Sequence, residues 1–278
     1  MDCAQFCPVG KLEKLLVATD GSQFSEGAIR EAISFAKKCS SKMYALSVLE
    51  TNPEYETIGS DVFEKEEAEM TRYLESVRAR ASQAGVACET IFLHGAEPHQ
   101  QIVDEAAEKS VDMIVIGRRG RRGLAKLLMG EVAAKVIAHA SCKVLVVPRA
   151  AKIEYKTILV ATDGSDHSIA AATEAITIAK RCGSGIIAVS ALRSESEYQE
   201  AQANLDKVRE LCQKEGVPVE ALSPLGRSYE VIVETAGGRG VDLIVMGAYG
   251  KTGLKKLLMG SSTEKVIGNA GCAVLVVR

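Results

Sequence analysis

Hydrophobic and polar residues alternate along the chain in two rhythms, one typical of buried strands and one typical of amphipathic helices. In the second half, short runs of β-branched and aliphatic residues predict strands at 157–161, 186–191, 219–222, 243–246 and 274–277. Longer segments with apolar residues at helical spacing predict helices at 168–182, 197–216, 229–237 and 261–268. Because strands that alternate with helices form βαβ units, this pattern predicts a doubly wound, mainly parallel sheet with helices on both faces.

The same pattern occurs twice. Residues 15–22 read LLVATDGS and residues 158–165 read ILVATDGS. Residues 123–147 match residues 253–277 at 16 of 25 positions without a gap. The sequence therefore predicts an α/β protein with two tandem doubly wound domains, each with a five-stranded, mainly parallel sheet.

The repeat also sets the expected boundaries. We place an amino-terminal extension at 1–10, a first domain at 11–149 and a second domain at 150–278. The connection at 148–156 is short and carries little apolar material, so we expect the domains to pack together rather than to be freely tethered. The apolar last strands, 144–147 and 274–277, read as sheet edges that seek a partner. They can pair within the chain as a pseudo-dimer, and a homodimer is the alternative.

Composition narrows the class of protein. The 278 residues are 47% hydrophobic and 25% charged, with a net charge of −2, so no global field attracts nucleic acid or an anionic membrane. Aromatic residues make up 4% and tryptophan is absent, which disfavours a stacking platform for nucleic acid. No apolar run has the roughly 20 residues that span a bilayer, and residues 1–10 do not read as a signal peptide. We therefore expect a cytoplasmic protein.

Eight cysteines raise the question of a disulfide or a metal site. Cys39 and Cys182 occupy matching positions in the two halves, as do Cys142 and Cys272, and all four lie in or beside apolar periodic segments. We interpret them as small buried hydrophobes. Cys3 and Cys7 lie outside the repeat without the ligand set of a zinc site, which disfavours a metal or redox role there. The four histidines form no metal-binding pattern.

Candidate chemistry gathers where the strands of the second half end. In an open parallel sheet, ligands bind beyond the carboxyl ends of the strands. Asp163 follows the first strand, Gly247 and Gly250 follow the fourth, and Gly260 with Ser261 opens the last helix. A glycine loop that leads into a helix amino terminus offers bare N–H groups to an anion, so the pattern favours a polyphosphate.

Each of these residues also has a structural interpretation. Ser261 and Glu264 can form a capping box, Gly260 can simply turn the chain, and Asp163 can cap the next helix or pair with a backbone amide. Their convergence at one sheet edge favours a nucleotide site. The sequence lacks a Walker A loop, a dinucleotide fingerprint after the first strand and a Gly-x-Ser-x-Gly elbow.

The aspartate after the first strand, the Gly-x2-Gly-x9-Gly-Ser spacing and the closing apolar strand resemble the universal stress protein family, and the repeat resembles its tandem members. The resemblance implies an adenine nucleotide alpha-hydrolase-like fold and ATP as the ligand, with Mg²⁺ as a possible companion. Residues 163–168 depart from the loop of the related adenine-hydrolysing enzymes, so pyrophosphatase chemistry is not implied. Carried over by position, the nucleotide-binding residues are Ala161, Thr162, Asp163, Ala191, Met246, Gly247, Tyr249, Gly250, Gly260, Ser261, Ser262 and Thr263.

The first half carries an altered copy of this motif. The corresponding residues of a second, weaker site are Asp20, Val48, Gly117, Gly120 and Gly130. Glu131 stands where the second half has Ser261, and arginines occupy 118, 119, 121 and 122. An arginine can pair with Glu131 and exclude ATP, the arginines can offset Glu131 so that a nucleotide still binds, or the run can be a solvated basic loop. We predict tighter ATP binding in the second half.

These observations favour a cytoplasmic stress-response protein that uses ATP as a regulatory nucleotide and acts on an unknown protein partner. No general base is evident beside the phosphate loop and no second carboxylate is placed for two-metal chemistry, so we expect a binding protein rather than an efficient enzyme. A slow Mg²⁺-dependent ATPase and a nucleotide-free interaction module are the alternatives.

Overall fold

A computed structural model describes residues 7–51, 60–120, 129–251 and 259–278 of the chain. Within these residues the first half runs β1 (Lys14–Ala18), α1 (Glu26–Cys39), β2 (Lys42–Glu50), α2 (Ser60–Gln83), β3 (Cys88–Gly95), α3 (Pro98–Glu108), β4 (Met113–Gly117), α4 (Glu131–His139) and β5 (Lys143–Val147). The second half runs β6 (Thr157–Ala161), α5 (Asp166–Cys182), β7 (Gly185–Val189), a 3-10 helix (Glu195–Glu197), α6 (Tyr198–Glu215), β8 (Val219–Leu222), α7 (Ser228–Gly238), β9 (Leu243–Gly247), α8 (Ser261–Asn269) and β10 (Ala273–Val277).

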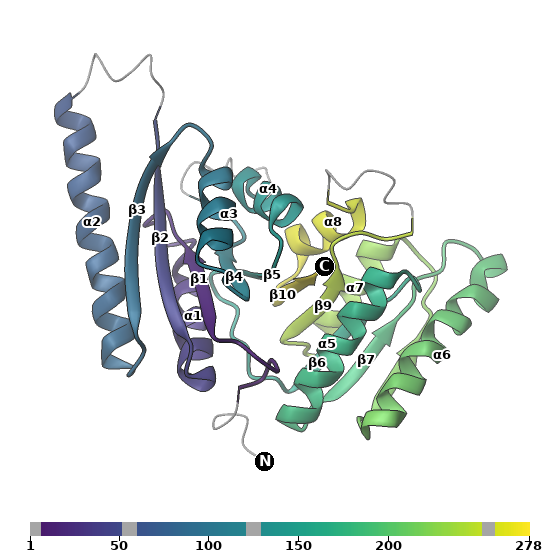
Figure 1. The fold of residues 1–278 in the computed structure, drawn as a ribbon. Coiled ribbons are helices and arrows are strands. Elements are labelled where there is room, and N and C mark those ends of the chain that lie inside the picture. The colour runs from purple at the N-terminus through teal and green to yellow at the C-terminus, as the bar shows by residue number, and fades with distance from the viewer. Residues whose placement is uncertain (1–6, 52–59, 121–128, 252–258) are drawn as a thin grey trace.

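The two halves form one continuous sheet (Figure 1). Its strand order is β3-β2-β1-β4-β5-β10-β9-β6-β7-β8, and the pairs within each half are parallel. At the centre, β5 and β10 pair antiparallel, with Leu145 opposite Leu275. The predicted pairing of the two last strands is therefore confirmed, and two five-stranded sheets become one ten-stranded sheet.

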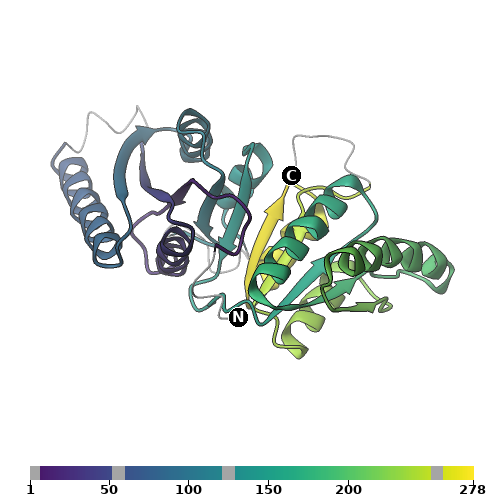
Figure 2. The ribbon, with the colours of Figure 1, turned by 60° about the horizontal axis from the view of Figure 1, so that its bottom comes forward.

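Helices cover both faces of this sheet, as the alternating pattern predicted (Figure 2). One core layer contains the buried sides of α1, α2, α5 and α6, and the other contains those of α3, α4, α7 and α8. The central strands β4 and β9 are buried along their whole length, which explains why they read as unbroken apolar runs. No helix in the described part of the chain combines the length and apolar character needed to cross a bilayer.

The connection between the halves differs from the expectation. Residues 148–156 were predicted to carry little apolar material, yet Ala151, Ile153 and Tyr155 are buried in the first core layer. Tyr155 packs edge-on against Phe35 of α1, with ring centroids 6.0 Å apart. A Cβ on Gly27 would lie 2.5 Å from the Pro148 carbonyl oxygen, so this glycine lets the connection pass directly over α1. The connection is thus part of the core that joins the halves.

The expectation for two of the cysteines is wrong. Cys39 forms a disulfide with Cys7, and Cys182, its counterpart at the end of α5, is also disulfide-bonded. Cys39 lies on the apolar side of α1 and is the last residue of that helix, and the amino-terminal segment folds back so that Cys7 reaches it. Cys142 and Cys272 are free thiols whose pKa is raised to about 11 by burial, in agreement with their interpretation as hydrophobes. Cys3 lies outside the described residues.

Candidate functional site

Asp163 follows β6 and joins two loops at the carboxyl edge of the second half. Its Oδ1 accepts hydrogen bonds from the Ser165 N–H at 3.0 Å and the Ser165 hydroxyl at 2.6 Å. Its Oδ2 accepts a hydrogen bond from the N–H of Lys251 at 2.8 Å. Burial alone would raise the pKa of Asp163, but these hydrogen bonds favour the charged form, and the pKa is lowered. The carboxylate therefore fixes the glycine loop against the turn before α5.

Gly250 makes this contact possible, because a Cβ there would lie 2.6 Å from Asp163 Oδ2. Thr162 secures the same turn from below: its hydroxyl accepts a hydrogen bond from the Gly164 N–H at 3.2 Å and lies 3.1 Å from the Ser168 hydroxyl. Ser165 caps α5 by accepting a hydrogen bond from the Ser168 N–H. Thr162 and Asp163 thus shape the site, and their side chains are already engaged with the protein.

Gly247 lies at the end of β9 directly beneath the start of α5. A Cβ on Gly247 would lie 2.9 Å from His167, so the glycine allows the strand and the helix to touch. Its carbonyl oxygen accepts a hydrogen bond from the buried hydroxyl of Thr263 at 3.1 Å. The Gly260 N–H donates to the carbonyl of Ala248 at 3.0 Å. These contacts bring the end of β9 and the beginning of α8 together, as the sequence predicted.

The amino terminus of α8 opens toward solvent at this edge. Gly260 is the N-cap residue and provides no side-chain hydrogen bond to the first turn. Ser261 is the first helical residue and is exposed, so the capping-box interpretation of Ser261 and Glu264 is wrong. The first-turn N–H groups and the hydroxyls of Ser261 and Ser262 therefore present a cluster of donors, which is the arrangement that binds anions.

Tyr249 takes a direction that the sequence did not indicate. Its buried side chain leaves the glycine loop, and its hydroxyl lies 3.2 Å from the carbonyl oxygen of Ala138 in the first half. Its ring lies 5.3 Å from that of His167, and the guanidinium of Arg278 lies 5.5 Å above it. Only the main chain of Tyr249 remains close to the start of α8.

Two of the remaining predicted positions, Met246 and Ala161, contribute mainly structure. The side chains of Met246 and Ala161 are buried in the second core layer. Ala191 is half-buried just beyond β7, and its counterpart Val48 is half-buried within β2, packed against the same layer. At these positions the main chain, rather than the side chain, is what the edge of the sheet can offer to a ligand.

The first half repeats the frame of this site. Asp20 Oδ1 accepts hydrogen bonds from the N–H and the hydroxyl of Ser22, and a Cβ on Gly120 would lie 2.8 Å from Asp20 Oδ2. Gly117 meets the chain before α1 as Gly247 meets His167. Gly130 is the N-cap of α4 and, like Gly260, makes no side-chain hydrogen bond.

The hydroxyl groups at the start of α8 have no counterpart in this copy. Ser261, Ser262 and Thr263 of α8 correspond to Glu131, Val132 and Ala133 of α4, so the first half lacks three hydroxyls at this point. The sequence already contained this signal, although only Glu131 was singled out.

The ion pairs of the first half bear on the hypothesis that an arginine holds Glu131. The Glu131 carboxylate lies 2.8 Å from Lys135 Nζ, and this partner lowers the pKa of Glu131. Arg118 instead reaches the second half, where its Nη1 donates to the carbonyl of Ala270 at 2.7 Å. Arg121 and Arg122 lie outside the described residues. Pairing of Glu131 with Arg118 is therefore not the arrangement adopted.

Lys251 is a further candidate that the pattern did not single out. It follows Gly250 directly, and its ammonium group lies 2.5 Å from Glu200 Oε1 of α6. Its N–H already holds Asp163. A half-exposed cation at this position can exchange its carboxylate partner for a phosphate oxygen.

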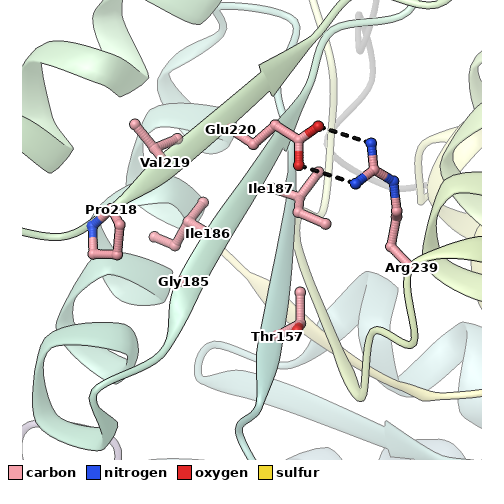
Figure 3. A pocket seen from close by; sticks show the side chains of 8 residues that line it. All are labelled: Thr157, Gly185, Ile186, Ile187, Pro218, Val219, Glu220 and Arg239. Carbon is pink, nitrogen blue, oxygen red and sulfur yellow. Dashed lines mark hydrogen bonds and ion pairs between the residues drawn. The ribbon is translucent and has the colours of Figure 1, made fainter.

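A separate hollow of about 460 Å³ lies at the other edge of the second half, where the strands begin (Figure 3). Arg239 bridges both carboxylate oxygens of Glu220 there, at 3.2 and 2.8 Å. Its lining comes from the amino ends of β6, β7 and β8 and from the start of the loop after α7. It is therefore distinct from the glycine-loop site.

Known proteins have sequences similar to each half of the chain. The model of the universal stress protein family matches residues 11–148 and again 154–278. A universal stress protein of Methanocaldococcus jannaschii is 40% identical over 140 residues, which cover 45% of this chain and 82% of that protein. One from Bacillus subtilis is 33% identical over 148 residues, which cover 48% of this chain and 97% of that protein.

The fold agrees with these sequence matches. The crystal structure of a universal stress protein from Archaeoglobus fulgidus superposes with a TM-score of 0.74 at 21% identity, and the match covers 95% of this chain and 98% of that one. At this identity the likeness establishes the shared fold. Together with the two matches to the family model, it leads to one assignment: the chain belongs to the universal stress protein family, with one family domain in each half.

Proposed function

We propose that this stress protein binds ATP in its second half and uses it as a regulatory nucleotide in the cytoplasm. The observation that carries the proposal is the uncapped amino terminus of α8 beside the loop that Asp163 holds. The first-turn N–H groups, the hydroxyls of Ser261 and Ser262 and the ammonium of Lys251 supply the donors that a triphosphate requires. The positive end of the helix dipole adds to their attraction for an anion.

Hydrogen bonds among the site residues support the binding of ATP at this position. The side chains of Thr162, Asp163 and Thr263 are hydrogen-bonded to the protein, so they hold the loops in place before a ligand arrives. Preorganised donors bind more tightly because little ordering remains to be done on binding. Adenine and ribose would then lie along the ends of β6 and β7, near the main chain of Ala191.

The difference between the halves supports a single strong site. In α4, Glu131 places a carboxylate where the second half has a serine, and Val132 and Ala133 offer no hydroxyl. A phosphate there meets a like charge and fewer donors. We therefore propose that the first half has little affinity for ATP and acts mainly as the structural partner of the second.

Binding rather than rapid hydrolysis suits these residues. The Asp163 carboxylate is committed to Ser165 and Lys251, so it is poorly placed to activate water. Mg²⁺ would arrive with the nucleotide, held mainly by its phosphate oxygens. If the purified protein releases ADP at about one turnover per second or faster with ATP and Mg²⁺, the protein is an ATPase and this part of the proposal is wrong.

Titration of ATP into matched variants tests the assignment. Gly260→Asp places a carboxylate at the N-cap of α8, and Gly130→Asp places one at the N-cap of α4. We expect the first variant to lose binding by 100-fold or more, on the order of the effect of a charge at a phosphate site, and the second to bind as the wild type does. Loss of binding only in Gly130→Asp would reverse the assignment. Absence of binding in the wild type would favour a nucleotide-free interaction module.

A further inference from the structure

The start of the described chain, residues 7–12, lies across both halves of the molecule. Cys7 is joined to Cys39 at the end of α1 in the first half. The carbonyl oxygen of Cys7 accepts a hydrogen bond from Arg181 Nε of α5 in the second half at 2.7 Å. A Cβ on Gly10 would lie 3.9 Å from Thr177, also in α5. We call residues 7–12 the clasp.

The clasp closes over the core that the halves share. Val9 and Leu12 are buried, with 1% and 4% of their surfaces exposed, in the layer that contains residues of both α1 and α5. The Ser41 hydroxyl donates to the carbonyl of Leu12, which anchors the end of the clasp before β1. Between Cys7 and Leu12 the remaining attachment is apolar burial and the bond from Arg181. The disulfide is therefore the covalent restraint that holds this short segment to α1.

Cys7 and Cys39 are also accessible to exchange. Both residues are half-buried, as are the free Cys88, Cys142 and Cys272, whereas the free Cys212 is buried. Burial raises the pKa of each of the four free thiols to about 11, so they carry almost no reactive thiolate at neutral pH. Cys7 and Cys39, whose Cα atoms lie 4.2 Å apart, are placed to form a disulfide with each other.

We propose that Cys7 and Cys39 form a reversible thiol–disulfide pair that locks and releases the clasp according to the redox state of the cell. Disulfides in cytoplasmic proteins are usually transient or redox-sensing. The co-reactant is a low-molecular-weight thiol–disulfide couple. One cysteine thiolate attacks the small disulfide, forms a mixed disulfide and releases one thiolate. The second cysteine thiolate then displaces the other, so that two thiols are oxidised and two small thiols are formed with their protons.

Release of the clasp has a defined structural consequence. α1 begins after its N-cap Ser25 and α5 after its N-cap Ser165, at the carboxyl edge of the sheet, and each helix ends at a disulfide cysteine. With the disulfide formed, the clasp holds the far ends of these two helices together over the β5–β10 seam. When this disulfide is reduced, the clasp loses its covalent bond to α1, and Val9 and Leu12 are free to leave the core.

Mass spectrometry and hydrogen exchange on the full-length protein test this proposal. The protein is equilibrated with oxidised or reduced glutathione, free thiols are alkylated, and peptides are mapped without reduction. We expect a Cys7–Cys39 cross-linked peptide that disappears in excess reduced glutathione. Amide exchange is then compared between the two states. Within residues 7–12 and the last turn of α1, we expect exchange to be ~10-fold or more faster in the reduced protein, as for a segment that opens locally.

Two variants separate the clasp from general effects of cysteine substitution. Cys39→Ser should show the fast exchange of the reduced state under both conditions, and Cys88→Ser, at a free thiol, should switch as the wild type does. Because the wild type alone reports the redox change, poor folding of Cys39→Ser would leave the test intact. The proposal is wrong if the cross-link does not form, if it resists excess glutathione, or if its reduction leaves the exchange of residues 7–12 unchanged.

Discussion

The hydroxyl of Tyr249, in the glycine loop of the second half, lies 3.2 Å from the carbonyl oxygen of Ala138 in the last turn of α4 in the first half. The reverse connection also exists: Arg118, in the matching loop of the first half, donates to Ala270 directly after α8. Each glycine loop thus contacts the carboxyl end of the helix whose amino end frames the other site. The two halves are connected at their sites as well as through the sheet.

The contribution of this contact can be measured with Tyr249→Phe. The change removes the hydroxyl, which donates to Ala138 and accepts a hydrogen bond from Arg278 Nη2 at 2.5 Å. Ala138 and Arg278 keep the hydrogen bond between them at 2.6 Å, so neither is left unpaired. We expect a loss of about 1 to 2 kcal/mol in the free energy of unfolding, because one neutral hydrogen bond and one from a charged group are removed. Guanidinium denaturation measures it. The exposed Tyr198→Phe is the control and should change stability by less than about 0.5 kcal/mol. Equal effects of the two changes would contradict this role for Tyr249.

Gly250→Ala tests the approach of the loop to Asp163. The new Cβ would lie 2.6 Å from Asp163 Oδ2, so the loop or the carboxylate must shift. We expect the affinity for ATP to fall by ~10-fold or more, because displacement of a preorganised donor set weakens binding. Gly120→Ala makes the matching clash with Asp20 in the first half and should leave ATP affinity unchanged. Calorimetric titration distinguishes the two, and an equal loss in both variants would count against a site in the second half.

Asp163 also gives a prediction for pH. Its hydrogen bonds lower its pKa in the folded protein, so the stability it contributes is present above its unfolded pKa of about 3.9. That stability is lost as pH falls through the folded pKa. At pH 7, Asp163→Asn should cost about 2 kcal/mol, as for hydrogen bonds to a charged group. At pH 2 to 3 the cost should shrink, whereas exposed Asp206→Asn should have little effect at either pH. A cost that is unchanged in acid would show that charge is not the cause.

The ion pair between Lys143 and Glu174, which joins the two halves, should contribute more to the free energy of unfolding than the exposed pair between Lys42 and Glu89. Lys143 Nζ lies 2.6 Å from Glu174 Oε2, and the Glu174 side chain is only 14% exposed. Its other oxygen is buried without a hydrogen-bond partner among the described residues. Lys143→Met leaves this carboxylate uncompensated and should cost about 2 kcal/mol, less than for a fully buried pair. Lys42→Met, at a pair of equal length but about half-exposed, should cost less than about 1 kcal/mol. Urea denaturation of both variants makes the comparison.

The sequence predicted the fold well because its signals are local. The strands at 157–161 and 219–222 match β6 and β8, and the other predicted ends in the second half lie within two residues of the observed ones. Because the same pattern occurs twice, each half supports the strands and helices predicted for the other. It also predicted that the final strands pair, because both are short, apolar edges.

What the sequence could not predict depends on contacts between distant segments. The apolar stripe of α1 indicated that Cys39 is covered, but not that Cys7 folds back to cover it. The direction of Tyr249 depends on the other half, where the carbonyl of Ala138 accepts a hydrogen bond from its hydroxyl, and on Arg278 at the end of the second half, which donates to it. The capping-box interpretation failed because helix α8 starts at Ser261 itself, so Gly260 takes the N-cap position.

A crystal structure of the full-length protein with a non-hydrolysable ATP analogue tests the central claim most directly. We predict density for one nucleotide in the second half, with its phosphates on the N–H groups of the first turn of α8 and beside Lys251. The turn between Asp163 and Ser165 should stay in place. A glycine loop filled by the protein's own side chains at saturating analogue, or a nucleotide bound only beside α4, would contradict the account.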